Sequence, residues 1–430
     1  MRNMSRAKVK SARLLLDIFD GVCYDMFKIR KEKGYMLYKR FLDREVSALG
    51  FGMMRLPMKD GEVDREQTEA MIDYAVTHGV NYFDTAYPYH GGVSELLAGE
   101  FLSKYPRESY CLATKFPGHQ LSSSYDAREI FEEQLSKCRT EYFDYYLLHN
   151  VNENSIDVYR DKKWNIINEF VKLRKEGKIR HLGFSSHGGY DLLKSFLDEY
   201  GKCMEFCQIQ FNYLDYTLQD AKKRYELLTE RNIPVIVMEP VRGGRLANLD
   251  EESSAMLKKA RPDDSIVSWA LRWAASFDNV KVVLSGMSDM SQMSDNIKTI
   301  ESFEKISDGE QDMLDKVSQR LHNNIPCTGC RYCCDGCPMG LNIPYLLDIA
   351  NEMRFSPSVN ATMRLDPLPD DKKPSACLSC GACKTICPQN IDIPLMLREL
   401  SEAAKKVRPW AEICKEREEA AKRMRQNGNK

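Results

Sequence analysis

Short apolar runs alternate with amphipathic helical stretches over the first three quarters of the chain. This alternation is typical of βα units that build a parallel sheet. Eight strand candidates follow, and their segments are VSALGFGMM from residue 46, NYFDTA from 81, YCLATKF from 110, FDYYLLHN from 143, IRHLGFSSH from 179, FCQIQFNY from 206, IPVIVMEP from 233 and VKVVLSGM from 280. Eight such strands predict an α/β fold, a (β/α)8 TIM barrel.

Polar residues stand at the C-terminal ends of these apolar runs. They are Asp84, Lys115, His149, Ser185, Asn212, Glu239 and Ser285. In TIM barrels the loops at this end of the strands build the active site. The pattern therefore predicts a catalytic rim of polar side chains.

The last quarter of the chain contains an internal repeat. The segment CTGCRYCCDGCPMGLNIP from residue 327 aligns without a gap with CLSCGACKTICPQNIDIP from residue 377, and both begin C-x2-C-x2-C-x3-C-P. In bacterial two-cluster ferredoxins with this spacing, three close thiolates bind one [4Fe–4S] cube and the fourth binds the other. By that rule one cluster takes Cys327, Cys330, Cys333 and Cys387, and the other takes Cys377, Cys380, Cys383 and Cys337.

Each copy of the repeat runs into a helical pattern that starts with proline, PYLLDIANEMRF and PLMLRELSEAAKK. Proline is tolerated there because the first N–H groups of a helix have no intrahelical acceptor. The long segment between the copies and these helices resemble the helical branch of dicluster ferredoxins. Four-cysteine zinc sites also use C-x2-C pairs, but zinc gives no reason for the same three gaps and a proline in both copies. Cys334 has no counterpart, since Lys384 stands there, and is interpreted as a spare thiol.

Composition narrows the possible functions. The net charge is −1, yet residues 1–35 and 403–430 each hold nine Lys or Arg against four Asp or Glu, which leaves an acidic body between two basic ends. A nucleic-acid protein would need a basic working face, so this class is not expected. No apolar run is long enough for a membrane span, and fifteen cysteines in a chain expected to be cytoplasmic favour metal ligation over disulfides.

Three motifs resemble a known family. GVNYFDTAYPYHGGVSE resembles the aldo-keto reductase signature D-T-A-x-x-Y-G, LATKF resembles the lysine strand of that family, and YYLLHN resembles its histidine strand. The resemblance covers about residues 36–300, and His90 intervenes after Tyr89, as in the iron–sulfur branch of the family. It implies a catalytic tetrad of Asp84, Tyr89, Lys115 and His149.

The resemblance also implies the role of each member of the tetrad. Reduction of a carbonyl delivers a hydride to carbon and a proton to oxygen. Tyr89 would donate the proton, with its pKa lowered by Lys115, which Asp84 would hold. His149 would orient the carbonyl oxygen.

A nicotinamide cofactor, NADPH or NADH, is implied in the same way. Gly286 and Gln292 stand where basic residues would pair with a 2′-phosphate, so the choice between the two cofactors stays open. Met238 stands where many members have a tyrosine that stacks on the nicotinamide. The implied cofactor residues are Ser185, Ser186, Gln208, Met238, Arg242, Gly243, Gly244, Gly286, Ser288, Gln292 and Asn296.

The expected organisation is a basic N-terminal extension (1–35), the barrel (36–305), a linking helix (306–325), a mainly helical ferredoxin-like domain with two [4Fe–4S] clusters (326–403) and a charged C-terminal helix or tail (404–430). The expected function is an NAD(P)H-linked oxidoreductase acting on a small carbonyl or alcohol, with clusters that exchange electrons with a one-electron redox protein. Two alternatives stay open, because no flavin motif is evident that could split an electron pair. The chain could be an electron-transfer or redox-sensing protein with the barrel as a docking body, or the clusters could be purely structural.

Overall fold

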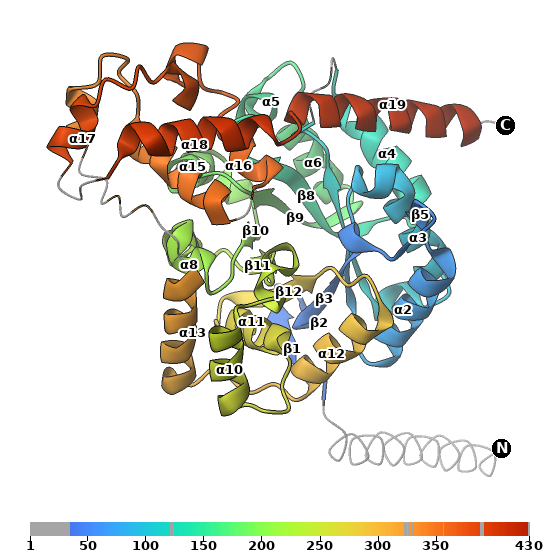
Figure 1. Ribbon diagram of the computed structural model, residues 1–430. Coiled ribbons are helices and arrows are strands. Elements are labelled where there is room, and N and C mark those ends of the chain that lie inside the picture. The colour runs from blue at the N-terminus through green and yellow to red at the C-terminus, as the bar shows by residue number, and fades with distance from the viewer. Residues whose placement is uncertain are drawn as a thin grey trace, which may run out of the picture.

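A closed barrel of parallel strands forms the centre of the molecule (Figure 1). The computed structural model describes residues 35–120, 122, 124–321, 325, 327, 331–355, 357–387 and 391–428. Within these residues the strand order around the barrel is β10-β11-β12-β3-β6-β7-β8-β9. The strands are β3 (Leu49–Gly52), β6 (Tyr82–Asp84), β7 (Cys111–Phe116), β8 (Phe143–Val151), β9 (Ile179–Ser186), β10 (Cys207–Gln210), β11 (Val235–Met238) and β12 (Val280–Ser285). The predicted TIM barrel is confirmed.

The first predicted strand needs a correction. The run from residue 46 contains the end of an antiparallel hairpin, β1 (Tyr38–Phe41) and β2 (Arg44–Ser47), and only then β3. Hydrogen bonding of the Ala48 N–H to Leu37 marks the break between them. Residues 1–34, most of the expected basic extension, lie outside the described residues.

The hairpin closes the amino-terminal end of the barrel. Phe41 stacks on Tyr145 at a ring distance of 4.6 Å and meets Phe206 edge-on at 5.6 Å, so apolar rings fill this end. Around them, the fully buried carboxylate of Asp144 accepts hydrogen bonds from Arg44 and two other arginines. Because a buried carboxylate is costly without partners, this cluster fixes the hairpin to β8. The other end of the barrel is left for the site.

Helices surround the barrel, and several begin at an aspartate or serine whose side chain accepts the N–H three residues later, as Asp64 and Asp126 do. They are α2 (Arg65–Thr77), α3 (Val93–Leu102), α4 (Ala127–Lys137), α5 (Ile156–Arg160), α6 (Ile166–Lys175), α7 (Tyr190–Tyr200), α8 (Asp215–Leu218), α9 (Ala221–Glu230), α10 (Glu251–Ala260), α11 (Ile266–Ala275) and α12 (Met290–Glu301). None of the helices in the described part of the chain is long and apolar enough to cross a bilayer.

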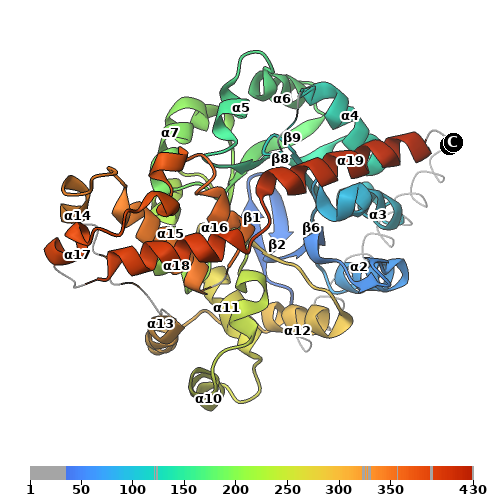
Figure 2. The same ribbon diagram turned by 45° about the horizontal axis from the view of Figure 1, so that its top comes forward.

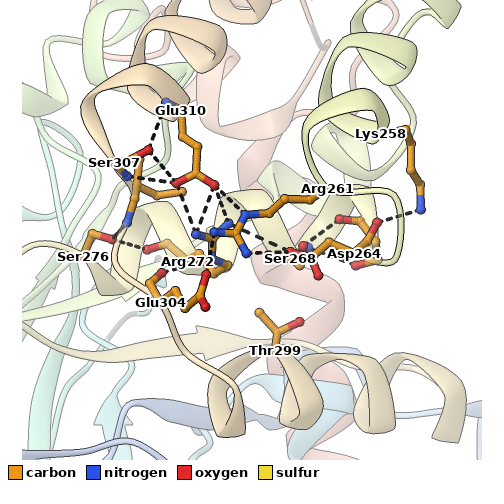
Figure 3. Close-up of polar contacts among 12 residues, drawn as sticks. Lys258, Arg261, Asp264, Ser268, Arg272, Ser276, Thr299, Glu304, Ser307 and Glu310 are labelled. Atoms are coloured by element: carbon orange, nitrogen blue, oxygen red, sulfur yellow. Dashed lines mark hydrogen bonds and ion pairs between the residues drawn. The ribbon is translucent and has the colours of Figure 1, made fainter.

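An ionic cluster fixes α13 (Asp308–Leu321) to the barrel (Figure 3). The Glu310 carboxylate accepts hydrogen bonds from the Ser307 N–H at 2.9 Å, from Arg261 and from Arg272 at 3.3 Å. Burial alone would raise the pKa of Glu310, but these donors lower it to about 2. The start of the connection between barrel and C-terminal part is therefore held by a charged carboxylate.

The C-terminal domain is helical and has its own apolar core. Its elements are α14 (Tyr332–Asp335), α15 (Ile343–Phe355), α16 (Val359–Met363), α17 (Ala382–Ile386) and α18 (Ile393–Lys405). The two predicted proline-started helices are α15 and α18, and they pack on each other through residues such as Leu346, Leu347, Leu397 and Leu400. Beside them, α14 and α17 carry cysteines of the two repeat copies and lie in contact.

The last helix, α19 (Trp410–Gly428), returns to the barrel (Figures 1 and 2). Trp410 donates its indole N–H to the carbonyl of His119 at 3.3 Å and stacks on the His119 ring at 5.5 Å. Near it, Asn154 donates to the carbonyl of Met363 at the end of α16. Because His119 follows β7 and Asn154 follows β8, α16 and α19 cover the carboxyl ends of the barrel strands.

The Glu310 cluster generates a prediction about stability. A carboxylate whose folded pKa is about 2 stabilises the fold above its ordinary pKa of 4.5 and loses that effect as the pH falls toward 2. Glu310→Gln should therefore lower the thermal midpoint at pH 7, by about 1 to 2 °C for each kcal/mol lost, and by less at pH 4. Scanning calorimetry measures both values.

The matched control is Glu304→Gln, which removes a partner of the same Arg261 but from a side chain that is 65% exposed. Its effect should be small at both pH values. A Glu310→Gln midpoint equal to wild type at pH 7 would contradict the role assigned to the cluster.

Candidate active site and cluster-binding cysteines

The structure brings the four predicted catalytic residues together at the carboxyl end of the barrel. Asp84 ends β6, Lys115 lies in β7 and His149 in β8, and Tyr89 begins the short helix η2 (Tyr89–Gly92). The Lys115 Nζ donates to Asp84 Oδ1 at 2.5 Å and to Tyr89 Oη at 3.3 Å. Asp84 and Tyr89 thus share one buried ammonium group between them.

The insertion of His90 has a local explanation. His90, Gly91 and Gly92 follow one another with φ values of 51°, 65° and 98°. This left-handed run turns the chain sharply from Tyr89 into α3, and glycine adopts it without steric cost. The strain at His90 is offset by a hydrogen bond, because its Nε2 accepts the N–H of Leu56 at 3.2 Å.

The charges of the tetrad follow from burial and pairing. The Lys115 side chain is 0% exposed. Burial would lower the pKa of Lys115, but Asp84 and Tyr89 outweigh it and raise the pKa, so Lys115 is charged. The expected lowering of the Tyr89 pKa is not found: burial raises the pKa of Tyr89 and the nearby Lys115 only partly opposes it. Tyr89 therefore keeps its proton at neutral pH.

Two histidine rings face Tyr89 and its surroundings. The His149 ring meets the Tyr89 ring edge-on at 5.7 Å, and the His119 ring lies 4.2 Å from that of His149. Burial lowers the pKa of both, that of His119 to about 3, so both are neutral. The Nδ1 atoms of both rings are buried and lack a hydrogen-bond partner among the described residues. His119 lies outside the three motifs, and its only sequence signal is its place just after the lysine strand.

A cavity of about 630 Å³ joins this cluster to the predicted cofactor positions. Two predicted cofactor residues do not line it. The Ser186 hydroxyl donates to the carbonyl of Val151 at 2.8 Å, and Arg242 Nε donates to Asp215 at 3.0 Å. The predicted residues that do line it are Asp84, Tyr89, His149, Ser185, Gln208, Met238, Gly243, Gly244, Gly286, Ser288, Gln292 and Asn296, and Lys115 lies behind Asp84 and Tyr89.

The lining has features that fit a dinucleotide. Gln208 Oε1 is buried without a partner among the described residues, as an acceptor for an amide N–H would be. Gly243 and Gly244 have φ values of 63° and 91°, so the loop after β11 presents bare backbone to the cavity. The Arg55 side chain, not singled out by the motifs, lies against both Gly243 and Gly286. A cation is thus available between the two loops predicted to hold the nucleotide.

One wall of the cavity comes from the C-terminal part of the chain. Val359 and Asn360 of α16 line it together with Trp410, Ile413 and Arg417 of α19. These residues lie beyond the barrel motifs, and nothing in their local sequence marks them. The cavity is therefore complete only when the C-terminal elements are docked.

The cysteines of the second repeat copy gather around a small pocket. Cys377, Cys380 and Cys383 line it together with Cys337, the fourth cysteine of the first copy. Cys377, Cys380 and Cys337 all contribute to the raised pKa of Cys383, whose main cause is burial. This is the set of four that the crossed ferredoxin pattern predicts.

The cysteines of the first copy are only partly described. Burial, with smaller contributions from the nearby Cys334 and Cys327, raises the pKa of Cys333 to about 12. Cys330 lies outside the described residues, and Cys387 packs at the edge of the C-terminal core. Among the residues that are described, no three Cys, His, Asp or Glu side chains form a group suited to a single metal ion.

Comparison with known proteins assigns both parts. Residues 48–319 match the model of the aldo/keto reductase family, and residues 326–391 match that of the 4Fe-4S dicluster domain. L-galactose dehydrogenase of Arabidopsis thaliana is 27% identical over 64% of this chain and 91% of its own length. NADH-specific methylglyoxal reductase of Escherichia coli is 25% identical over 65% of this chain and 97% of its own.

Solved structures agree on the barrel. An aldo-keto reductase from Bacillus halodurans in its holo form aligns with a TM-score of 0.55 and 26% identity, over 66% of this chain and 96% of its own. One from Klebsiella pneumoniae in complex with NADP and acetate has the same fold. It aligns with a TM-score of 0.51 and 20% identity, over 64% of this chain and 92% of its own. The family match extends over more than half of the chain. The chain belongs to the aldo/keto reductase family and carries a C-terminal 4Fe-4S dicluster domain.

Proposed function

We propose that the barrel interconverts a small carbonyl compound and its alcohol with a nicotinamide cofactor, and that the C-terminal domain binds two [4Fe–4S] clusters. The observation that carries the catalytic part is the hydrogen-bonded chain from Asp84 through Lys115 to Tyr89, at the end of a cavity that extends to the predicted cofactor residues. If these polar residues only formed structural hydrogen bonds at the surface of the barrel, a fully buried ammonium group would not be needed.

In the proposed reaction, Tyr89 Oη donates its proton to the carbonyl oxygen. A bound nicotinamide supplies the hydride for the carbonyl carbon. The Lys115 ammonium, 3.3 Å from Oη, stabilises the tyrosinate that remains. The neutral ring of His149 orients the carbonyl oxygen beside Tyr89. The raised pKa of Tyr89 keeps the donor protonated at neutral pH, and the positive charge of Lys115 near Oη limits the cost of ionising the tyrosine.

We propose further that the cofactor is NADH. Gln292, at a predicted adenosine-end position, is engaged with the Ser288 N–H at 3.0 Å and with Asp289 at 2.8 Å. Asp295 lines this end of the cavity. A carboxylate here would repel a 2′-phosphate and accept a hydrogen bond from a 2′-hydroxyl. The similar reductase of Escherichia coli is named as NADH-specific.

The cluster proposal assigns one cube to Cys327, Cys330, Cys333 and Cys387 and the other to Cys377, Cys380, Cys383 and Cys337. The grouping of Cys337 with the second copy supports the crossed pattern.

Electron exchange with a one-electron redox protein is the proposed role of the clusters. Cys380 is exposed, and Leu378 and Ile386 of the same repeat copy are 64% and 51% exposed. Figure 2 shows α14 and α17 at the outer edge of the C-terminal domain, on the side away from the barrel strands. This face is open to a partner, whereas Tyr89 lies at the covered end of the barrel.

Removal of the Tyr89 hydroxyl should remove the proton donor. Tyr89→Phe should lower kcat/KM for NADH-driven aldehyde reduction by at least about 10²-fold, as expected for loss of a general acid, with NADH affinity retained. Tyr87→Phe is the control, because Tyr87 Oη contacts Glu133 at 3.3 Å and does not line the cavity. Equal losses in the two variants would assign proton donation elsewhere.

The cofactor proposal predicts an affinity difference. Fluorescence titration should give a Kd for NADH at least about 10-fold below that for NADPH, equivalent to about 1.4 kcal/mol. Gln292→Arg should reduce the difference between the two Kd values, because it adds a cation for the 2′-phosphate of NADPH. Tighter binding of NADPH by the wild-type protein would refute the assignment.

The cluster proposal predicts metal content. Anaerobically reconstituted protein should contain about eight iron and about eight sulfide per chain. Cys380→Ser should lower both values, whereas Cys334→Ser, at the thiol without a counterpart in the second copy, should not. Bound zinc in place of iron, or the same loss in both variants, would contradict the ligand assignment.

A further inference from the structure

Arg417 occupies an unusual position in the wall of the catalytic cavity. It lies on α19 at the same helical face as Trp410, Ile413 and Cys414, because these residues are spaced at i, i+3, i+4 and i+7. That face is docked: Trp410 and Cys414 are buried against Met363, with Ile413 beside them. The guanidinium of Arg417 stacks over the Trp410 ring at 5.1 Å, so the tryptophan fixes its place.

The charge of Arg417 has no carboxylate counter-ion among the residues that the structure describes. Two arginines line the cavity within the described residues, and Arg55 is paired with Glu239 at 3.9 Å. Arg417 forms no ion pair and no hydrogen bond with any described residue, although Glu416 and Glu418 flank it in sequence. Burial lowers its pKa, because desolvation disfavours the charged form. Desolvating a half-buried guanidinium costs free energy unless a bound anion pairs with it.

The surroundings of Arg417 are neutral on the catalytic side. His119 and His149 are uncharged, because burial places their pKa values well below neutrality. Asp84, the one carboxylate of the tetrad, is already bonded to Lys115. Arg417 is also close enough that its charge helps to lower the pKa of His149 and partly opposes the burial that raises the pKa of Tyr89. An anion at Arg417 would therefore sit beside the carbonyl position without a competing negative charge.

We propose that Arg417 binds the anionic group of the substrate, so that the preferred substrate is a small aldehyde or ketone that also carries a carboxylate or phosphate. The proposal rests on the proposed carbonyl reduction and names its substrate class. The planar guanidinium suits both anions, since it offers parallel N–H donors to two oxygens. The anionic group is unchanged in the reaction: the carbonyl carbon gains the hydride, and the carbonyl oxygen gains the Tyr89 proton.

The test compares anionic aldehydes with neutral analogues. With the full-length cluster-loaded protein and NADH, kcat/KM is measured for 4-formylbenzoate and its neutral methyl ester. A second pair, 4-formylphenyl phosphate and 4-methoxybenzaldehyde, distinguishes a phosphate from a carboxylate preference. The wild-type protein should prefer the anion of at least one pair by about 10- to 10²-fold, as expected for hydrogen bonds to a charged group.

The variants are chosen to separate anion binding from structural support. Arg417→Met should abolish the preference for the anion, and Arg417→Lys should retain part of it. Lys415→Met is the control, because Lys415 is an exposed cation on the same helix, and the preference should survive. A preference that persists in Arg417→Met, or equal losses for anion and ester, would overturn the proposal.

A binding measurement separates this proposal from that of the reaction. Calorimetric titration with terephthalate, or with phenyl phosphate for the phosphate arm, should show binding to the wild-type protein and at least about 10-fold weaker binding to Arg417→Met. If the wild-type protein reduces none of the aldehydes, the proposed reaction fails, while the titration still decides the anion site. No binding by the wild-type protein, or equal binding by the variant, refutes the site.

Discussion

The ion pair between Lys115 and Asp84 is the contact on which the catalytic end of the barrel depends. An ammonium group with no exposed surface costs several kcal/mol to bury, and only a close carboxylate and further acceptors offset that cost. The neighbouring strand β6 supplies the carboxylate. Asp84 pairs with Ala113 in the β6–β7 register, and Lys115 lies two residues further along β7. The carbonyl of Thr85 accepts a third hydrogen bond at 2.7 Å. Tyr89 is then positioned by a group that the barrel itself holds rigidly.

The cluster-binding segment and the barrel are joined by packing around one cavity. Helix α19 follows α18 after a short link, and its Trp410 is 7% exposed where it meets His119. The cluster-binding domain also presents exposed Cys380, which lies before α17 at its outer edge. The proposed hydride chemistry and the proposed single-electron exchange thus lie at different places, while the C-terminal elements close the cavity that Tyr89 lines. A supporting role for the proposed clusters and a redox role are compatible in this arrangement, since cluster binding would stabilise the domain that leads into α19.

Features set by local sequence could be predicted, and those set by distant packing could not. Apolar runs located the eight strands, and the motifs located the residues that converge at Tyr89. The wall at Trp410 could not be foreseen, because its contact with His119 joins residues 291 positions apart. The direction of the Tyr89 pKa shift depends on how deeply the side chain is buried, and a sequence motif does not give that depth. Arg242 stands in a predicted cofactor loop, but its guanidinium is bound to Asp215.

A single-turnover experiment tests most directly whether the hydride step is complete within the barrel. Cluster-loaded protein is mixed with an aldehyde and with NADH that carries deuterium at the transferred position, and the nicotinamide and cluster absorbances are followed together. Direct transfer with proton donation by Tyr89 predicts one alcohol per NADH, a primary isotope effect on NADH oxidation, and a cluster spectrum that does not change. Reduction of the clusters before the alcohol forms, without an isotope effect on the alcohol step, would contradict it.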